Sequence, residues 1–178
     1  GQLQLQNGYP PHEVQTAREN RPVAFVSWGD AARFVNWLHN GQPTGAQNAA
    51  TTEDGAYTLN GATSVVALNA ITRNAGATWV IPNEDEWYKA AYYSPVLGIG
   101  GYWDFPTQSN TINTSMASYN KGSWTAPENI NSYGYPSYYG TKDQGGNILE
   151  WIESAFASNQ RVNRGGMYYS PESELKAS

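Results

Sequence analysis

The sequence predicts a mixed α+β domain with two helices, a small antiparallel sheet and long irregular loops. Two segments, at about 28–39 and 84–93, have the apolar spacing and the capping residues of amphipathic helices. Two short β-rich runs come near the C-terminal end, at about 148–152 and 161–164. Residues 98–136 mix many aromatic residues with Asn, Ser, Thr and Gly and have little periodicity, which is typical of loops held by ring packing.

The first helix is predicted to run from about Trp28 to His39. Ser27 precedes Asp30 by three positions, which is the spacing of a capping box, and apolar residues then recur along one helical face. Gly41 favours an end to the helix, because glycine readily adopts the left-handed conformation that follows many helices. We expect His39 to interact with the free carbonyl groups of the last turn rather than to bind a ligand.

The second helix is predicted to run from about Glu84 to Tyr93. Asn83 is a favourable N-cap residue, and Ser94 followed by Pro95 ends the pattern. The acidic residues of the first turn, at 84–86, lie at the positive end of the helix dipole. We interpret them as compensating that dipole rather than as catalytic groups.

The remaining N-terminal half is predicted to contain a surface loop and two strands. Residues 42–60 are rich in Gly, Asn, Thr and Ala, and we expect a loop that packs through Tyr57 and Leu59. The segments 63–71 and 78–81 are β-rich and are expected to form strands.

Composition limits the class of protein. A chain of 178 residues with 39% hydrophobic content is expected to form one core, and no apolar run approaches the ~20 residues that cross a membrane. The net charge is −5 and the cations are scattered, so we expect no nucleic-acid partner. The sequence contains no cysteine and therefore no disulfide or thiolate site. Its low content of charged residues favours an extracellular or cell-surface location, and we see no signal peptide.

A glycine-rich segment before the last β-rich runs has the features of a calcium-binding turn. Asp143 and Glu150 supply hard oxygen ligands, and Gly145 and Gly146 allow the backbone to turn its carbonyl groups inward. The same residues also fit a plain glycine-rich hairpin in which Asp143 closes an Asx turn and Glu150 is solvated. The spacing alone does not separate these two interpretations.

Four motifs in order along the chain resemble the formylglycine-generating-enzyme (sulfatase-modifying factor) domain family, whose fold is a variant of the C-type lectin fold. They are the segment 21–38 with its Arg-Pro-Val start, the Ile-Pro-Asn-Glu segment at 81–92, the glycine turn at 139–151, and Arg-Gly-Gly at 164–166. The resemblance implies a domain over residues 21–178, preceded by an N-terminal extension or partial strand region at 1–20. Family members extend beyond both ends, so we expect a domain truncated at both ends.

The resemblance also implies one calcium site. In the family, ligands match the side chain of Asp143, the carbonyl groups of Gly146 and Ile148, and the carboxylate of Glu150. A second family site has its nearest match at 118–119, where the following acidic loop is missing, and we expect no second ion there.

The resemblance does not extend to the family's oxidase chemistry. That reaction uses two copper-binding cysteines, and an ungapped count from the glycine pair places their positions at Ser170 and Leu175. Neither residue is a ligand for a soft monovalent metal, so no copper and no catalytic residue are expected. No other common catalytic motif occurs in the sequence.

The resemblance assigns structural and ligand-binding roles near the C-terminal end. We interpret Arg164, Gly165 and Gly166 as structural: an arginine fixed by carbonyl or carboxylate groups, and glycines that admit close packing. Residues after this motif line the ligand surface in the family. The candidate ligand contacts are Tyr168, Tyr169 and Ser170 after this motif, and Trp124 in the aromatic region at 98–136. The alternative is that the two tyrosines pack over the sheet.

Three functions remain open from the sequence. The first is a non-catalytic, calcium-stabilised recognition domain for a glycan or protein ligand. The second is the variable, target-binding protein of a diversity-generating retroelement, a group that uses the same fold. The third is a self-assembling structural surface protein, in which a partner strand completes an open sheet edge.

Overall fold

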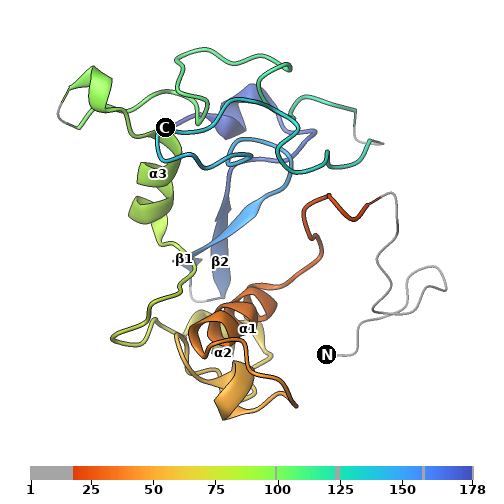
Figure 1. Cartoon of the computed structure of the whole chain (residues 1–178), viewed down its shortest axis with the longest axis vertical. Helices are drawn as coiled ribbons and strands as arrows, with labels where there is room; N and C mark the ends of the chain where they lie inside the picture. Colours follow the sequence, from red (N-terminus) through yellow and green to blue (C-terminus); the bar gives the residue numbers. More distant parts are fainter. Residues whose placement is uncertain (1–17, 99, 123–124, 158, 178) are drawn as a thin grey trace.

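The computed structural model describes residues 18–98, 100–122, 125–157 and 159–177. Its elements, in chain order, are α1 (Trp28–His39), a π-helical turn (Ala49–Glu53), α2 (Val65–Asn69), α3 (Glu84–Tyr92), a 3₁₀ turn (Pro95–Leu97), β1 (Glu150–Ala157), β2 (Gln160–Arg164) and a second 3₁₀ turn (Glu172–Leu175). The β1–β2 hairpin runs along the long axis of the molecule (Figure 1). α1 and α2 lie at one end of it, and α3 and the long loops lie at the other. The α+β class is therefore confirmed.

α1 has the predicted bounds and the predicted capping box. The side chain of Ser27 accepts a hydrogen bond from the Asp30 backbone N–H, and the Asp30 carboxylate accepts one from the Ser27 N–H. The role expected for His39 was wrong. Its Nδ1 accepts a hydrogen bond from the backbone N–H of Thr78 at 3.2 Å, so the imidazole joins the helix end to another segment. Backbone N–H groups just past the helix bind the last carbonyls instead, as Asn40 does.

α3 also follows the prediction and ends one residue early, at Tyr92. Asn83 and Glu86 form a reciprocal capping box, with N–H to oxygen distances of 2.8 and 2.9 Å. The acidic first turn does more than compensate the dipole, because its side chains form ion pairs with distant arginines. Glu84 pairs with Arg164 and Glu86 with Arg73, so the start of α3 is bound to other segments.

The two strands predicted in the N-terminal half were wrong. Residues 63–71 contain the short helix α2, which begins after Ser64, whose side chain accepts a hydrogen bond from the Ala67 N–H. Residues 78–81 form no strand, because the Ile81 N–H donates to the buried hydroxyl of Tyr57 at 2.9 Å instead of to a neighbouring strand. Long-range contacts thus override the β propensity of both segments. The predicted loop at 42–60 also contains the π-helical turn.

The sheet consists of β1 and β2, which pair antiparallel from Glu150 opposite Arg164 to Ala157 opposite Gln160. β1 starts two residues later than predicted and extends five residues further. The outer edge of β1 is partly occupied, since the N–H of Glu153 donates to the carbonyl of Pro82 at 2.8 Å. None of the helices in the described ranges has both the length and the apolar character needed to cross a membrane.

The buried apolar residues form three clusters instead of one core. We call them the α1 cluster (Trp28, Ala32, Ala56, Tyr57, Leu59, Leu68, Ile81), the loop cluster (Phe105, Ile112, Ala117, Tyr119, Leu175) and the α3 cluster (Trp87, Ala91, Tyr92, Ile152). The hairpin connects the α1 cluster and the α3 cluster, because neighbouring residues of a strand point to opposite faces. Trp151 packs against the α1 cluster and Ile152 belongs to the α3 cluster.

Candidate cation and ligand-binding site

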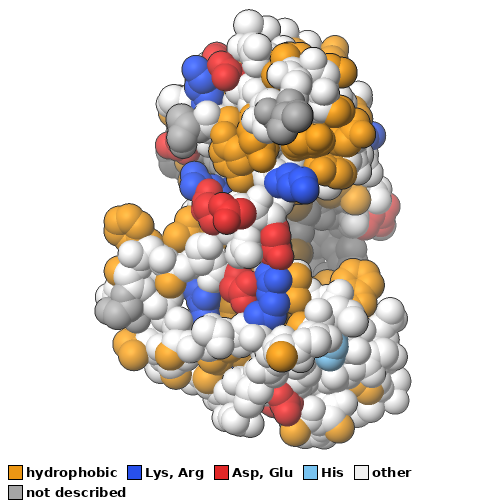
Figure 2. Space-filling model, turned by 90° about the vertical axis from the view of Figure 1, so that its left-hand side faces the viewer, with side chains coloured by type: hydrophobic (Ala, Val, Ile, Leu, Met, Phe, Trp, Pro, Cys, Tyr) orange, Lys and Arg blue, Asp and Glu red, His pale blue; other side chains and the backbone are white. Residues whose placement is uncertain are grey.

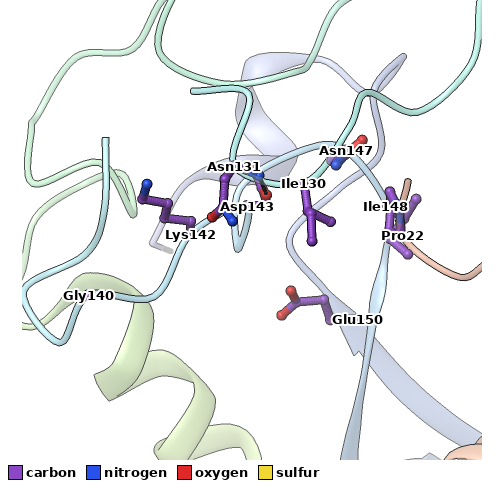
Figure 3. Close-up of a pocket in the computed structure, with 9 residues that line it drawn as sticks. All are labelled: Pro22, Ile130, Asn131, Gly140, Lys142, Asp143, Asn147, Ile148 and Glu150. Carbon is purple, nitrogen blue, oxygen red and sulfur yellow. Dashed lines mark hydrogen bonds between the residues drawn. The ribbon is translucent and has the colours of Figure 1, made fainter. Parts of the chain in front are cut away.

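The residues expected to bind calcium come together at a pocket of about 340 Å³, where the glycine turn meets the start of β1 (Figure 3). The pocket is lined by Pro22, Ile130, Asn131, Gly140, Lys142, Asp143, Asn147, Ile148 and Glu150. Three of the four expected calcium ligands are among these residues. The fourth, Gly146, lies buried in the same turn.

The two acidic side chains of the pocket are close enough to influence each other. Burial of Glu150 raises its pKa to about 7, and the negative charge of Asp143 adds to this rise. A hydrogen bond of 2.6 Å from the Trp87 indole N–H to the Glu150 carboxylate opposes it. Asp143 accepts a hydrogen bond from the Asn131 N–H at 2.9 Å. The pocket therefore brings two carboxyl groups together, and the basic residue Lys142 also lines it.

The backbone at Gly146 requires glycine. Its φ is 84°, a left-handed conformation, and a Cβ there would lie 2.1 Å from the carbonyl oxygen of Ser118. Its N–H donates to the carbonyl of Gly165 at 2.7 Å. No described residue donates a hydrogen bond to the carbonyl oxygens of Gly146 or Ile148.

These donors suit a hard cation, because calcium prefers carboxylate and carbonyl oxygens. The described residues contain no group of three or more acidic or histidine side chains that would hold a metal. A calcium ion at this pocket would thus depend on the two backbone carbonyls and on water to reach its usual six to eight or so ligands.

Asn147 is the residue at this site that the sequence analysis missed. It adopts a left-handed conformation with φ of 63°, and its N–H donates to the carbonyl of Ser118 at 2.8 Å. Its side-chain oxygen accepts from the Glu128 N–H at 2.9 Å, and its carbonyl accepts from the Tyr168 N–H at 3.0 Å. One residue of the turn thus holds three loops. The sequence feature that could have identified Asn147 is its place directly after two glycines, because asparagine tolerates a positive φ.

The Arg-Gly-Gly segment makes the contacts of a structural element. The Arg164 guanidinium donates to both carboxylate oxygens of Glu84. Gly165 has φ of 94°, and a Cβ there would lie 2.5 Å from the carbonyl oxygen of Gln144. Gly166 has φ of 72°, and its Cβ would lie 2.8 Å from a methyl group of Leu175. Each glycine therefore allows a close approach that a side chain would block.

The residues expected to contact a ligand differ in exposure. Trp124 lies outside the described residues. Tyr168 is half-buried and Tyr169 is 44% exposed, with ring centroids 4.9 Å apart and planes nearly perpendicular. Ser170 was expected to contact a ligand, but it is only 4% exposed and its hydroxyl accepts from the Met167 N–H at 2.9 Å. Its side chain is occupied in holding the loop.

A larger group of tyrosines, which the sequence analysis did not identify, lies where the chain enters the glycine turn; three of them are exposed, and Tyr88 and Tyr93 are half-buried. We call it the tyrosine surface; it comprises Tyr88, Tyr93, Tyr102, Tyr138 and Tyr139. Contacting ring centroids lie 5.0 to 6.1 Å apart. Tyr138 and Tyr139 are about half exposed. Hydrophobic side chains gather over this end of the molecule on the face that carries α3 (Figure 2). The available signal was the tyrosine pair immediately before the glycine turn.

Comparisons with known proteins identify the fold and the family. No curated protein sequence matches the chain. Among solved structures, Treponema denticola variable protein 1 is similar, with a TM-score of 0.64 and 20% identity over 96% of this chain and 67% of that one. A structure of CarF is similar with a TM-score of 0.59 and 22% identity, over 88% of this chain and 60% of that one. The model of the sulfatase-modifying factor enzyme 1-like domain matches residues 2–178. The chain therefore belongs to the sulfatase-modifying factor enzyme 1-like domain family.

Proposed function

We propose that this chain is a non-catalytic recognition domain, stabilised by one calcium ion, that binds a protein or glycan ligand through exposed tyrosines. One observation carries this proposal: the turn that contains the candidate calcium ligands lies between two groups of tyrosines, and each group has exposed members. Tyr139 precedes the pocket residue Gly140 directly in the chain. On the other side, the Asn147 carbonyl accepts a hydrogen bond from the N–H of Tyr168.

Asp143 and Glu150 would bind the ion with their carboxylates, and Gly146 and Ile148 with their carbonyls. The ion would favour the charged form of Glu150, whose pKa burial raises. It would also hold the turn in its strained left-handed conformation, which two non-glycine residues, Asp143 and Asn147, adopt. An ordered turn fixes the loops that present the tyrosines, and preordered loops lose less entropy on binding.

Tyrosine suits recognition, because it offers a large apolar face and a hydroxyl group while losing little entropy on binding. Catalysis by the family's oxidase reaction is not part of the proposal, because the sequence has no cysteine to bind copper. We further propose that the domain acts outside the cell or at its surface.

A thermal melt with calcium and with a chelator tests the metal site. If calcium is present at about 100 times its dissociation constant, stabilisation is about 2.7 kcal/mol. For a domain of this length, that corresponds to a rise of about 5–11 °C in Tm. Asp143→Asn and Glu150→Gln should abolish the rise, whereas Glu172→Gln, a change at an exposed acid, should keep it. Equal melting in calcium and chelator would refute the metal site.

A glycan array and a displayed peptide library, both probed with the calcium-loaded chain, test the recognition role. Tyr138→Ala and Tyr169→Ala remove exposed rings from the two groups, and at least one of them should weaken a selected ligand by about tenfold or more. Phe156→Ala, which removes an 80% exposed ring elsewhere, is the control. Ligands that bind both tyrosine variants as tightly as the wild type would contradict these surfaces.

A second candidate is the variable target-binding protein of a diversity-generating retroelement. The likeness in fold to Treponema denticola variable protein 1 supports it. Sequencing the gene from many isolates tests it. Codon variation should concentrate at Tyr168 and Tyr169, beside a reverse transcriptase gene, and should spare the buried Ser170. Uniform codons at Tyr168 and Tyr169 would exclude this role.

A further inference from the structure

A second pocket lies at the α1 end of the molecule, away from the candidate cation site. It is an open pocket between α1 and the segment 43–52, and its volume is about 340 Å³. Ligand pockets in proteins span about 300–1,000 Å³, so this one suits a small ligand or one unit of a larger one. The proposed function above makes no use of it.

An exposed aromatic surface forms one wall of this pocket. Phe34 is 57% exposed, so its ring gains little stability from burial. It stacks on Trp37 with ring centroids 5.7 Å apart and planes inclined by 26°. The Trp37 indole N–H donates to the carbonyl of Pro43 at 3.0 Å, which fixes the orientation of the larger ring. The result is a preformed aromatic platform.

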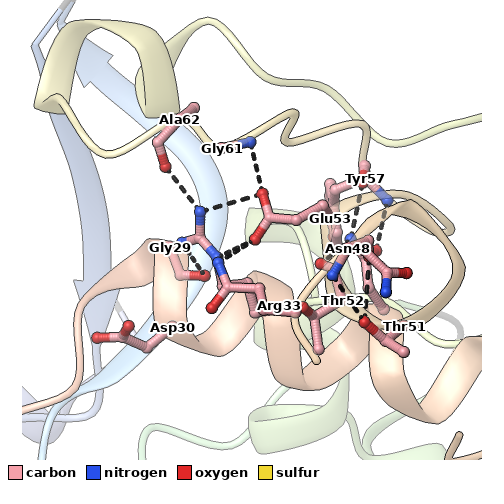
Figure 4. Close-up of polar contacts among 12 residues, drawn as sticks. Gly29, Asp30, Arg33, Asn48, Thr51, Thr52, Glu53, Tyr57, Gly61 and Ala62 are labelled. Carbon is pink, nitrogen blue, oxygen red and sulfur yellow. Dashed lines mark hydrogen bonds and ion pairs between the residues drawn. The ribbon is translucent and has the colours of Figure 1, made fainter. Parts of the chain in front are cut away.

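The opposite wall is held rigidly by a buried ion pair (Figure 4). The carboxylate of Glu53 accepts from Arg33 Nε at 2.6 Å and from the Gly61 N–H at 2.6 Å. The side-chain amide of Asn36, on α1, donates to the carbonyl of Thr52 at 2.8 Å. Because these groups are already ordered, a ligand would not have to order the wall on binding.

The charges in this pocket cancel. Arg33 lines it, but its guanidinium pairs with Glu53 and donates hydrogen bonds to the carbonyls of Gly29 and Ala62, at 3.3 and 2.9 Å. Among the described residues that line the pocket, no cation remains unpaired to favour a phosphate or carboxylate ligand. Gln47, on the exposed rim, donates through Nε2 to Glu53, and no described residue donates to its Oε1. The rim therefore offers neutral hydrogen-bonding groups.

We infer that this pocket binds one ring of a neutral saccharide. A pyranose ring has a face of C–H groups and an edge of hydroxyl groups. The C–H face packs on Phe34 and Trp37, where weak C–H contacts to aromatic rings add to apolar burial. The hydroxyl groups bind the Gln47 side chain and the exposed backbone of Gly45. An aromatic platform with a neutral polar rim matches both parts of such a ligand.

NMR titration of the full chain with four methyl glycosides, those of glucose, galactose, mannose and N-acetylglucosamine, tests the inference. The Trp37 indole N–H, assigned by its loss in Trp37→Phe, reports on the pocket directly. At least one glycoside should shift it saturably, with a millimolar dissociation constant typical of a single small ring, about −4 kcal/mol of binding free energy. The titration is run in chelator, so its result does not depend on the proposed calcium site or on the tyrosines.

Variants of the exposed ring separate saccharide binding from an unspecific change. Phe34→Ala should weaken binding by about tenfold, or 1.4 kcal/mol, and Phe34→Tyr should restore it. Phe156→Ala, another exposed ring, should leave binding unchanged. The inference is overturned if none of the four glycosides gives a saturable shift up to about 50 mM. It is also overturned if a Phe34→Ala protein with wild-type circular dichroism binds as tightly as the wild type.

Discussion

Replacing Gly146 by alanine should destabilise the protein by about 2–5 kcal/mol. Its left-handed backbone, with φ of 84°, costs a residue with a Cβ roughly 1–2 kcal/mol. The new Cβ would lie 2.1 Å from the Ser118 carbonyl oxygen, whereas ordinary contact begins at 3.4 Å. The carbonyl must therefore move, which breaks its 2.8 Å hydrogen bond from the Asn147 N–H and costs about 1–3 kcal/mol more. In a thermal melt we expect Tm to fall by about 4–20 °C.

Gly76→Ala is the matched control for this prediction. Gly76 has nearly the same backbone angle, φ of 79°, but a Cβ there would meet no atom within 4 Å. It should therefore lose only the conformational part, about 1–2 kcal/mol, or about 2–8 °C in Tm. If both variants melted at the same temperature, the close approach of the Ser118 carbonyl would contribute nothing, and the reasoning would fail.

Two further predictions concern buried acids. Because the pKa of Glu150 is about 7 in the folded protein and has an ordinary value of 4.5, unfolding between these pH values releases a proton. The contribution of Glu150 to the free energy of unfolding should therefore be complete below about pH 4.5 and should decrease as the pH rises towards 7. Melting in chelator at several pH values measures this decrease, and Glu150→Gln should make it smaller. Glu53→Gln should cost about 3–5 kcal/mol in urea denaturation, because it leaves the largely buried Arg33 without its counterion. Glu128→Gln, which breaks the more exposed pair with Lys121, should cost less than about 1 kcal/mol, and equal losses would contradict the role of burial.

The sequence predicted α1 and α3 well, because the signals that define them are local. Each helix begins with a capping box whose two partners lie three residues apart, as with Ser27 and Asp30. The segments 63–71 and 78–81 failed for the opposite reason. Their β-branched residues favour strands, but Ile81 bonds to Tyr57, a partner that only the folded chain brings near.

In the candidate site, too, the features with local sequence signals were predictable and those that depend on long-range contacts were not. Asp143, Ile148 and Glu150 lie close along the chain, and the motif that joins them made their common location predictable. The tyrosine surface combines residues from 88 to 139; Tyr138 and Tyr139 are adjacent in the sequence, but the other members come from segments that only the fold brings near them. The Phe34 and Trp37 pair is local, but the wall facing it comes from the loop at 43–52, which folds through the buried ion pair of Glu53.

The division of the buried residues into three clusters has a consequence for how this protein can change. Trp151 packs against the α1 cluster and Ile152 belongs to the α3 cluster, so these two clusters lie on opposite faces of β1. The loop cluster contains no residue of the hairpin. We expect such a molecule to open in parts, with amide exchange at the two ends following separate local unfolding reactions. Substitutions that loosen the tyrosine-bearing end should then leave the pocket at α1 intact. The two ends are free to acquire different binding partners, each with little cost to the other.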